Sequence, residues 1–197
     1  VCRELMSVYP NLFYLSSVGR VPLTEKTMLV GHDGWYDGLY SQFSENSVIM
    51  NDFYIIKEFK ETANFNNARW NPKVIKDTHN LMKNLASEGA NIIEKNILDS
   101  VEKYKNIIVA THVPPFRENS VYCGKISNDV WMPCFSSKIL GDKLLDLSEN
   151  YKNINFKVYC GHSHGNAIHQ PRLNLTSTTG YAKYEFPWLG ITSLNIE

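Results

Sequence analysis

The chain lacks the features that mark several large classes of protein. Its 197 residues contain no apolar run close to the ~20 residues that a membrane-spanning helix needs, so we expect no membrane partner. Its 20 Lys and Arg residues balance its 20 Asp and Glu residues, so no basic surface for nucleic acid is indicated. It has no internal repeat and no low-complexity segment. A single globular domain over residues 1–197 remains, and 43% hydrophobic and 20% charged residues fit this class.

Cysteine is also scarce. The four cysteines, Cys2, Cys123, Cys134 and Cys160, form no CxxC pair and are too few for a disulfide scaffold. We therefore expect reduced thiols and a cytoplasmic location. Cys160 is expected in the core, although its thiolate is chemically able to bind a metal.

Histidines follow two predicted strands. The apolar run Ile107–Ala110 precedes Thr111-His112-Val113-Pro114-Pro115, and Phe156–Tyr159 precedes Cys160-Gly161-His162-Ser163-His164-Gly165. Open α/β sheets place their ligand sites at the carboxyl ends of strands. Because neutral imidazole is the commonest protein ligand for several transition metals, the pattern predicts a metal site made by His112, His162 and His164.

A packing role is the alternative for each of these histidines. A single His at the end of a strand is usually a hydrogen-bonded packing residue. In Gly-His-Ser-His, however, residues i and i+2 point the same way at strand spacing. The flanking Gly161 and Gly165 let the backbone turn sharply and approach closely, so both rings can face one pocket. The metal interpretation is therefore favoured.

The same segments carry a family resemblance. THVPP at residues 111–115 and CGHSHG at residues 160–165 resemble the last two signature blocks of the calcineurin-like metallophosphoesterases. GHDGWYDG at residues 31–38 and PFRE at residues 115–118 are similar to one bacterial branch of that family. The resemblance implies an α/β fold, a layered sandwich in which two mixed sheets pack face to face between helices.

The resemblance also implies a chemistry. It predicts two divalent or trivalent metal ions (Mn, Fe or Zn), with His112 and His162 on one ion and His164 on the other. A bound hydroxide would then attack a phosphomonoester or phosphodiester, because two ions clamp the phosphate oxygens and acidify a water molecule. The expected partner is thus a phosphorylated small molecule or another phosphoester substrate.

Three earlier blocks of the family are absent from this sequence. These are Asp-x-His, Gly-Asp-x-x-Asp and Gly-Asn-His followed by Asp or Glu. The chain is therefore interpreted as the carboxy-terminal part of a longer enzyme, whose amino-terminal unit is missing. A missing amino-terminal segment or a second chain would complete the site. No catalytic residue can be assigned, because the family's catalytic His belongs to the third block.

Three further residues are predicted to bind substrate. Arg117 follows His112 by five residues, and its guanidinium can bind a phosphate through two hydrogen bonds. His32 and Asp33 can reach the site from the loop that follows them. The alternatives are a structural salt bridge for Arg117, and stabilisation of the loop together with Trp35 for His32 and Asp33.

Two other functions remain open beside the phosphoesterase. One is a non-catalytic metal-binding or scaffold domain that retains the fold, supported by the missing acidic blocks. The other is a mononuclear zinc hydrolase with three histidine ligands, which needs only residues present in the sequence.

The hydrophobic pattern predicts an alternation of helices and strands. A long helix is expected over about 73–105, with Pro72 at its start and Gly89 as a candidate interruption. A second helix is expected over Ser137–Asn150, capped by Ser136 or Ser137. Long functional loops are expected over 31–46 and 113–136. The other predicted strands are Leu12–Leu15, Val21–Leu23, Thr27–Val30, Ala167–Gln170, Leu173–Ser177, Tyr181–Glu185 and Leu189–Ile196.

Overall fold

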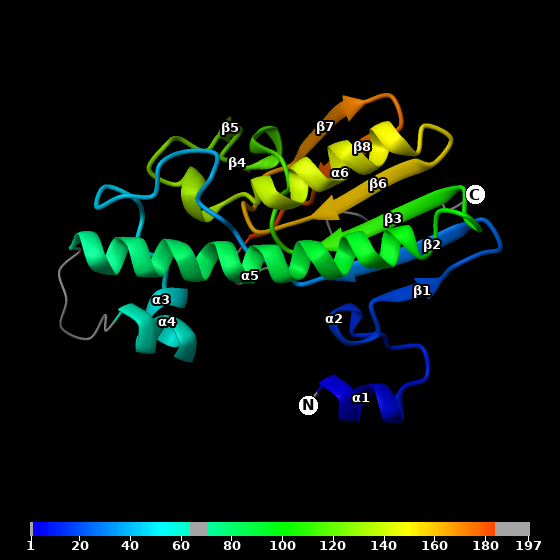
Figure 1. Ribbon diagram of the computed structural model, residues 1–197, viewed down its shortest axis with the longest axis horizontal. Helices are drawn as coiled ribbons and strands as arrows, with labels where there is room; N and C mark the ends of the chain where they lie inside the picture. The colour runs from blue at the N-terminus through cyan, green and yellow to red at the C-terminus, as the bar shows by residue number, and fades with distance from the viewer. Residues whose placement is uncertain (1, 64–70, 184–197) are drawn as a thin grey trace.

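A computed structural model describes residues 2–63 and 71–183 (Figure 1). Its centre is a six-stranded mixed sheet with the strand order β1-β2-β3-β6-β8-β7. Strands β2, β3, β6 and β8 are parallel, and β1 and β7 run antiparallel at the two edges. The sheet strands are β1 (Arg20–Pro22), β2 (Thr27–His32), β3 (Asn106–Thr111), β6 (Asn155–Cys160), β7 (Ala167–Arg172) and β8 (Leu175–Thr179).

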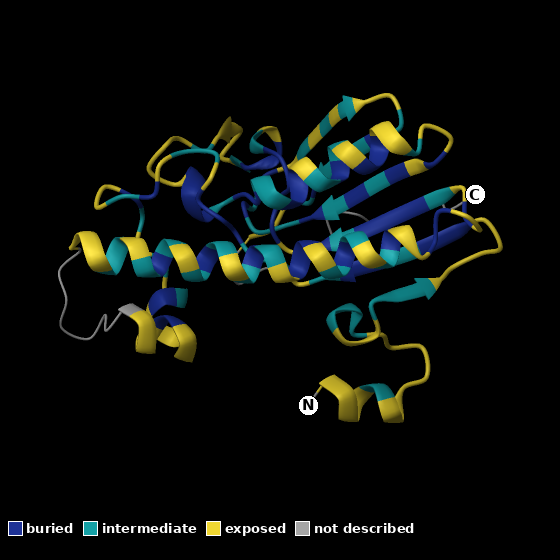
Figure 2. Cartoon of the chain, in the orientation of Figure 1, coloured by how far each residue is buried: buried dark blue, intermediate teal, exposed yellow. Residues whose placement is uncertain are grey.

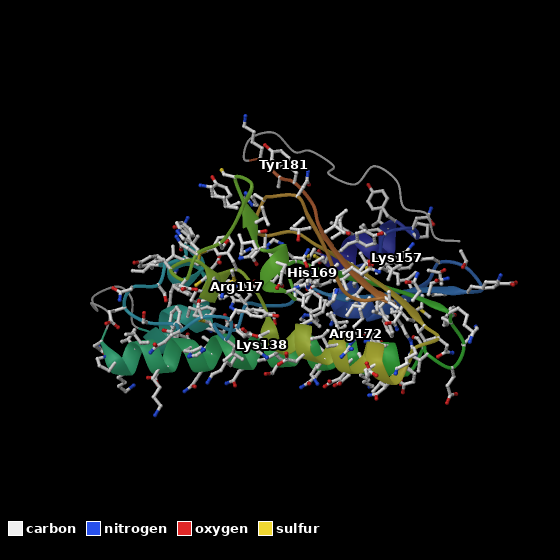
Figure 3. The ribbon with its side chains drawn as sticks, turned by 90° about the horizontal axis from the view of Figure 1, so that it is seen from above. Arg117, Lys138, Lys157, His169, Arg172 and Tyr181 are labelled. Carbon is white, nitrogen blue, oxygen red and sulfur yellow. The ribbon has the colours of Figure 1, made fainter. Side chains whose placement is uncertain are left out.

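Helices α5 and α6 lie side by side on one face of this sheet, as two views of the molecule show (Figures 1 and 3). The helices of the described residues are α1 (Cys2–Val8), α2 (Leu15–Val18), α3 (Asp52–Ile55), α4 (Lys57–Ala63), α5 (Pro72–Leu98) and α6 (Lys138–Asn150), with short 3-10 turns at η1 (Arg117–Asn119) and η2 (Met132–Cys134). The prediction of an α/β fold with a mixed sheet flanked by helices is confirmed.

The main core fills the space between the sheet and these two helices. Strands β2 and β3 are mostly buried, β6 alternates between buried and less buried residues, and α5 alternates between buried and exposed residues (Figure 2). We call this cluster the sheet–helix core. It is made mostly of aliphatic side chains: Met28, Val30, Ala90, Ile93, Ile97, Val101, Tyr104, Ile107, Val109, Phe116, Leu140, Leu144, Leu147, Ile154, Phe156, Val158 and Leu175.

A second buried cluster lies beyond the carboxyl ends of the strands. It draws on the loop after β2, on α3 and α4, and on the amino-terminal half of α5. Because four of its members are aromatic, we call it the aromatic cluster: Tyr36, Phe43, Phe53, Phe59, Met82, Val113 and Cys134. The ring contacts within it run from Tyr36 to Phe53 and from Phe53 to both Phe43 and Phe59.

The two long helices begin where the sequence predicts them, but α5 ends at Leu98 and does not continue to residue 105. The side chain of Asn71 accepts from the Val74 amide, and Pro72 occupies the first turn of α5, where its missing N–H costs nothing. The Ser137 hydroxyl accepts from the Leu140 amide and caps α6. Gly89 does not interrupt α5. A side chain there would approach His32 Nδ1 to 2.8 Å, so the glycine permits close packing of the helix against the end of β2.

Some strand predictions fail. Residues 12–14 form no strand, and Leu15 begins helix α2. In place of a second large sheet packed face to face with the first, the described residues form one two-stranded hairpin, β4 (Val121–Tyr122) with β5 (Lys125–Ile126). The predicted strand Tyr181–Glu185 extends beyond the described residues, and Leu189–Ile196 lies outside them. No helix in the described part of the chain has the length and apolar character to cross a membrane.

Candidate metal centre

The parallel strands deliver three loops to one edge of the sheet. Strand β3 pairs with β2 on one side and with β6 on the other, so their carboxyl ends meet. The His112 amide donates to the Asp33 carbonyl at 3.0 Å, and the Gly161 amide donates to the His112 carbonyl at 2.9 Å. These backbone bonds hold the three loops together just beyond the strands.

Two of the three predicted ligands are in direct contact there. His112 Nε2 lies 3.0 Å from His162 Nδ1. On its other side, His162 Nε2 lies 2.8 Å from the Cys134 carbonyl, which can only accept, so this nitrogen carries the hydrogen. Nδ1 of neutral His162 therefore has a free lone pair, and it accepts from Nε2–H of His112.

This spacing fits two ligands of a single metal ion. Two nitrogens at ~2.0–2.1 Å from one ion lie about 3.0 Å apart when they subtend about 90°. To hold an ion through Nε2, neutral His112 would have to carry its hydrogen on Nδ1 instead. Fixing one ring nitrogen by a bond to a carbonyl is a common way of orienting a histidine ligand.

Aromatic rings enclose His162 on two sides. Its ring stacks on Tyr36, with centroids 5.7 Å apart and planes inclined by 20°, and contacts Phe135 at 4.9 Å. We call Tyr36, Phe135 and the Cys134 carbonyl the His162 cage. Burial lowers the pKa of His162 to about 4, helped by His112 and His164 and opposed by the bond to Cys134. The ring is therefore neutral near pH 7, as metal ligation requires.

His112 and His164 share this electrostatic environment. Burial also lowers the pKa of His112, while Asp52 and Asp33 raise it and His164 lowers it. His164 thus lies near enough to influence both other histidines. His162 and His164 have φ angles of 66° and 62°, in the left-handed region that non-glycine residues rarely adopt. Such backbone strain gathers at functional sites.

The described residues do not complete a metal site by themselves. In residues 2–63 and 71–183, no three or more His, Cys, Asp or Glu side chains are grouped so as to hold an ion together. His112 and His162 fit as two ligands of one ion, and further ligands are needed.

The predicted substrate-binding residues have different surroundings. His32 accepts from the Gly34 amide through Nδ1 and packs against Gly89 of α5, which matches the loop-stabilising alternative. Asp33 accepts from the Tyr14 hydroxyl and lies close enough to raise the pKa of His112. Arg117, labelled in Figure 3, forms an ion pair of 3.2 Å with Asp129, whose side chain is 77% exposed.

Sequence reasoning missed Asp52 and Asp37. Asp52 lies at the start of α3, where helix capping explains an Asp well enough, but its carboxylate accepts from Tyr36 and raises the pKa of His112. Asp37 is fully buried, and burial raises its pKa to about 6 although three hydrogen bonds lower it. Apart from Leu39, the partners of their side chains are 16 or more residues away in sequence, and the spacing of residues carries no signal for them.

An open polar hollow of about 450 Å³ lies on the loops around the aromatic cluster. Tyr40, which lines it, also donates its hydroxyl hydrogen to the Pro115 carbonyl, three residues after His112. Asp129, the partner of Arg117, also lines it. The lining residues are Tyr40, Ser41, Gln42, Ser44, Asn46, Ser47, Asp129 and Val130.

Comparison with known proteins gives a structural likeness and no sequence match. No family model and no curated protein matches the chain. A crystal structure of a dimetal phosphatase from Danio rerio superposes with a TM-score of 0.50 at 10% sequence identity. The match covers 94% of this chain and 57% of that one, so the chain spans little more than half the length of its neighbour. At this identity the likeness shows the fold alone.

Proposed function

We propose that the chain is part of a metal-dependent phosphoesterase that hydrolyses a phosphomonoester or a phosphodiester. One observation carries the proposal: Nε2 of His112 and Nδ1 of His162 lie 3.0 Å apart at the carboxyl edge of the sheet, and the Cys134 carbonyl fixes the His162 tautomer. The likeness of the fold to a dimetal phosphatase supports it.

In this proposal His112 and His162 bind one ion and His164 binds a second. The ions, Mn, Fe or Zn, would neutralise the phosphate charge and acidify a water molecule. Asp33 and Asp52 supply negative charge beside His112, which stabilises positive charge at that position.

Arg117 is proposed to bind the phosphate group. Its ion pair with Asp129 joins two half-exposed or exposed side chains, and such a pair contributes only about 0–1 kcal/mol. The guanidinium can therefore leave Asp129 for a phosphate, to which it donates two parallel hydrogen bonds. The polar hollow beside Asp129 would then receive the organic part of the ester.

A two-ion centre needs more carboxylates than the described residues bring to the histidines. We propose that they come from an additional amino-terminal segment or from a second chain. The chemistry sets this requirement, because neutral imidazoles alone do not balance the charge of two divalent ions.

A second candidate is a metal-binding or scaffold domain without catalysis. The absence of any three-ligand group among the described residues favours it. The same observation weighs against a mononuclear zinc hydrolase, which needs three histidines converging on one ion.

Hydrolysis of p-nitrophenyl phosphate and bis(p-nitrophenyl) phosphate with added Mn²⁺ tests the proposal. Metal-dependent release of nitrophenol is expected, and His162→Ala should abolish it. Leu173→Ala is the control, because Leu173 is exposed in the turn between β7 and β8, at the end of β8 opposite its carboxyl end, and should keep full activity. Mn²⁺ binding without hydrolysis would support the scaffold, and equal activity in both variants would overturn the site.

A further inference from the structure

We infer that Asp37 is a positioning residue for His162: its buried carboxylate ties together the two chain segments that form the His162 cage. The inference depends on the proposed function only in treating His162 as a metal ligand.

The two sides of the cage come from segments about 100 residues apart. Tyr36 comes from the loop after β2, whereas Cys134 and Phe135 come from the segment that leads into α6. Both rings contact the same imidazole, so its position depends on the distance between these segments. A small displacement of either would change how closely the rings contact His162.

Asp37 joins the segments directly beside the cage. Its amide donates to the Ser136 carbonyl at 3.3 Å. Its carboxylate Oδ2 accepts from the Ile139 amide at 2.7 Å and from the Ser137 hydroxyl at 3.4 Å. Asp37 follows Tyr36, and Ser136 follows Phe135. The hydrogen bond between Asp37 and Ser136 therefore lies one residue from each of the two rings.

A third element holds the same residue. Nε2–H of His79 on α5 donates to the Asp37 carbonyl at 2.9 Å. The other carboxylate oxygen of Asp37 accepts from the Leu39 amide at 3.0 Å, which closes the turn locally. The loop after β2, α5 and the start of α6 thus meet at one residue with 0% exposure.

A buried carboxylate is an expensive way to fill this space. An apolar residue of similar size would avoid the desolvation of a charge, but it would leave the Ile139 amide without a partner. Asp provides two oxygens for three donors, at a helix amino terminus where negative charge is favoured. Its geometry therefore specifies how the two segments meet, in addition to filling volume.

Asp37→Asn tests the inference, because it keeps the shape and replaces one acceptor by a donor. The first measurement needs no metal: long-range ¹H–¹⁵N correlation spectra report the tautomer and the ring-proton shifts of each of the six histidines. In the variant we expect the His162 ring protons to lose part of the shift caused by Tyr36 and Phe135, while His169 is unchanged. The second measurement is Mn²⁺ affinity, which should fall about 10–100-fold, as when the partner of a ligand is removed.

Leu147→Ala is the control for a purely structural role. Leu147 is buried in the sheet–helix core near the end of α6, far along the helix from Ser137. It should lower the melting temperature but leave the His162 signals and the Mn²⁺ affinity as in the native chain. If Asp37→Asn does not fold, Ser137→Ala removes one donor to Asp37 and should shift the same signals by less.

Unchanged His162 signals in a folded Asp37→Asn or Ser137→Ala protein would overturn the inference, as would the same displacement in Leu147→Ala. The proposed function can fail separately. If the native chain binds no Mn²⁺ and hydrolyses no ester, the metal-free spectra still decide whether Asp37 positions His162.

Discussion

The sheet–helix core and the aromatic cluster solve different problems. The core is mostly aliphatic and comes mainly from the strands of the sheet and from α5 and α6. The aromatic cluster comes largely from a loop and two short helices, and one of its rings, Tyr36, lies against His162. Branched aliphatic side chains fill volume between regular elements, whereas flat rings with few rotamers can fix the plane of an imidazole. The difference separates the part that specifies the fold from the part that specifies the site.

Phe156→Ala should have the largest effect on stability. Phe156 on β6 is 0% exposed in the sheet–helix core, and such a truncation costs about 3–5 kcal/mol. Urea denaturation followed by circular dichroism measures the loss. The histidine spectra of the folded fraction should match the native protein, and a shifted His162 would show that the two clusters are not separable in this way.

The second largest effect is expected in how the stability of Asp37→Asn depends on pH. The folded pKa of Asp37 is about 6, above its ordinary value of 3.8, so between these values the folded state holds a proton that the unfolded state releases. The contribution of Asp37 to the free energy of unfolding therefore falls as pH rises from 3.8 to about 6, by about 3 kcal/mol in total.

His162 acts in the opposite direction. Its pKa is about 4 in the folded state, against an ordinary value of 6.5. Its contribution to the free energy of unfolding is therefore fully present above pH 6.5 and is lost as pH falls towards 4. The two effects offset each other in the native chain. Asp37→Asn should therefore lose stability on acidification more steeply than the native protein, in urea denaturation at pH 4.5, 5.5 and 7. Parallel curves for the two proteins would contradict the assignment.

Tyr36→Phe separates the ring from its hydroxyl. The hydroxyl donates to Asp52 at 3.3 Å, and losing one such bond costs about 0.5–1.5 kcal/mol. The ring still stacks on His162, so the His162 ring-proton shifts should remain within those of the native protein. Tyr36→Leu removes the ring too, and its His162 signals should move.

Lys138→Ala should have the smallest effect. Lys138 pairs with Asp142 one turn along α6, with both side chains 40% or more exposed. Because exposed pairs contribute little, we expect a change within about 0.5 kcal/mol in urea denaturation and no change in any histidine signal. A larger loss would mean that the start of α6 is more sensitive than the Asp37 contacts alone explain.

The periodic parts of the molecule were predictable. Apolar residues at three- and four-residue steps, with Pro72 at the start, predicted α5, and Ser137 predicted the start of α6. The rule that sites lie at the carboxyl ends of parallel strands placed His112 and His162 together, although their metal role stays a prediction.

The long-range contacts of the site were not predictable from the same patterns. Asp37 meets Ile139, 102 positions away, and Tyr36 meets His162 from a loop without hydrophobic periodicity. The short apolar segment at 12–15 has no neighbouring strand to pair with, and it does not form a strand. Local sequence specifies an element only where long-range packing agrees with it.

Helix α5 has a consequence for how the molecule unfolds. Its 27 residues extend about 40 Å at 1.5 Å per residue, with Met82 in the aromatic cluster and Ile93 and Ile97 in the sheet–helix core. Neither cluster can come apart without exposing one half of the same helix. The central amides of α5 should therefore exchange with solvent only when the whole domain opens, as a single cooperative unit.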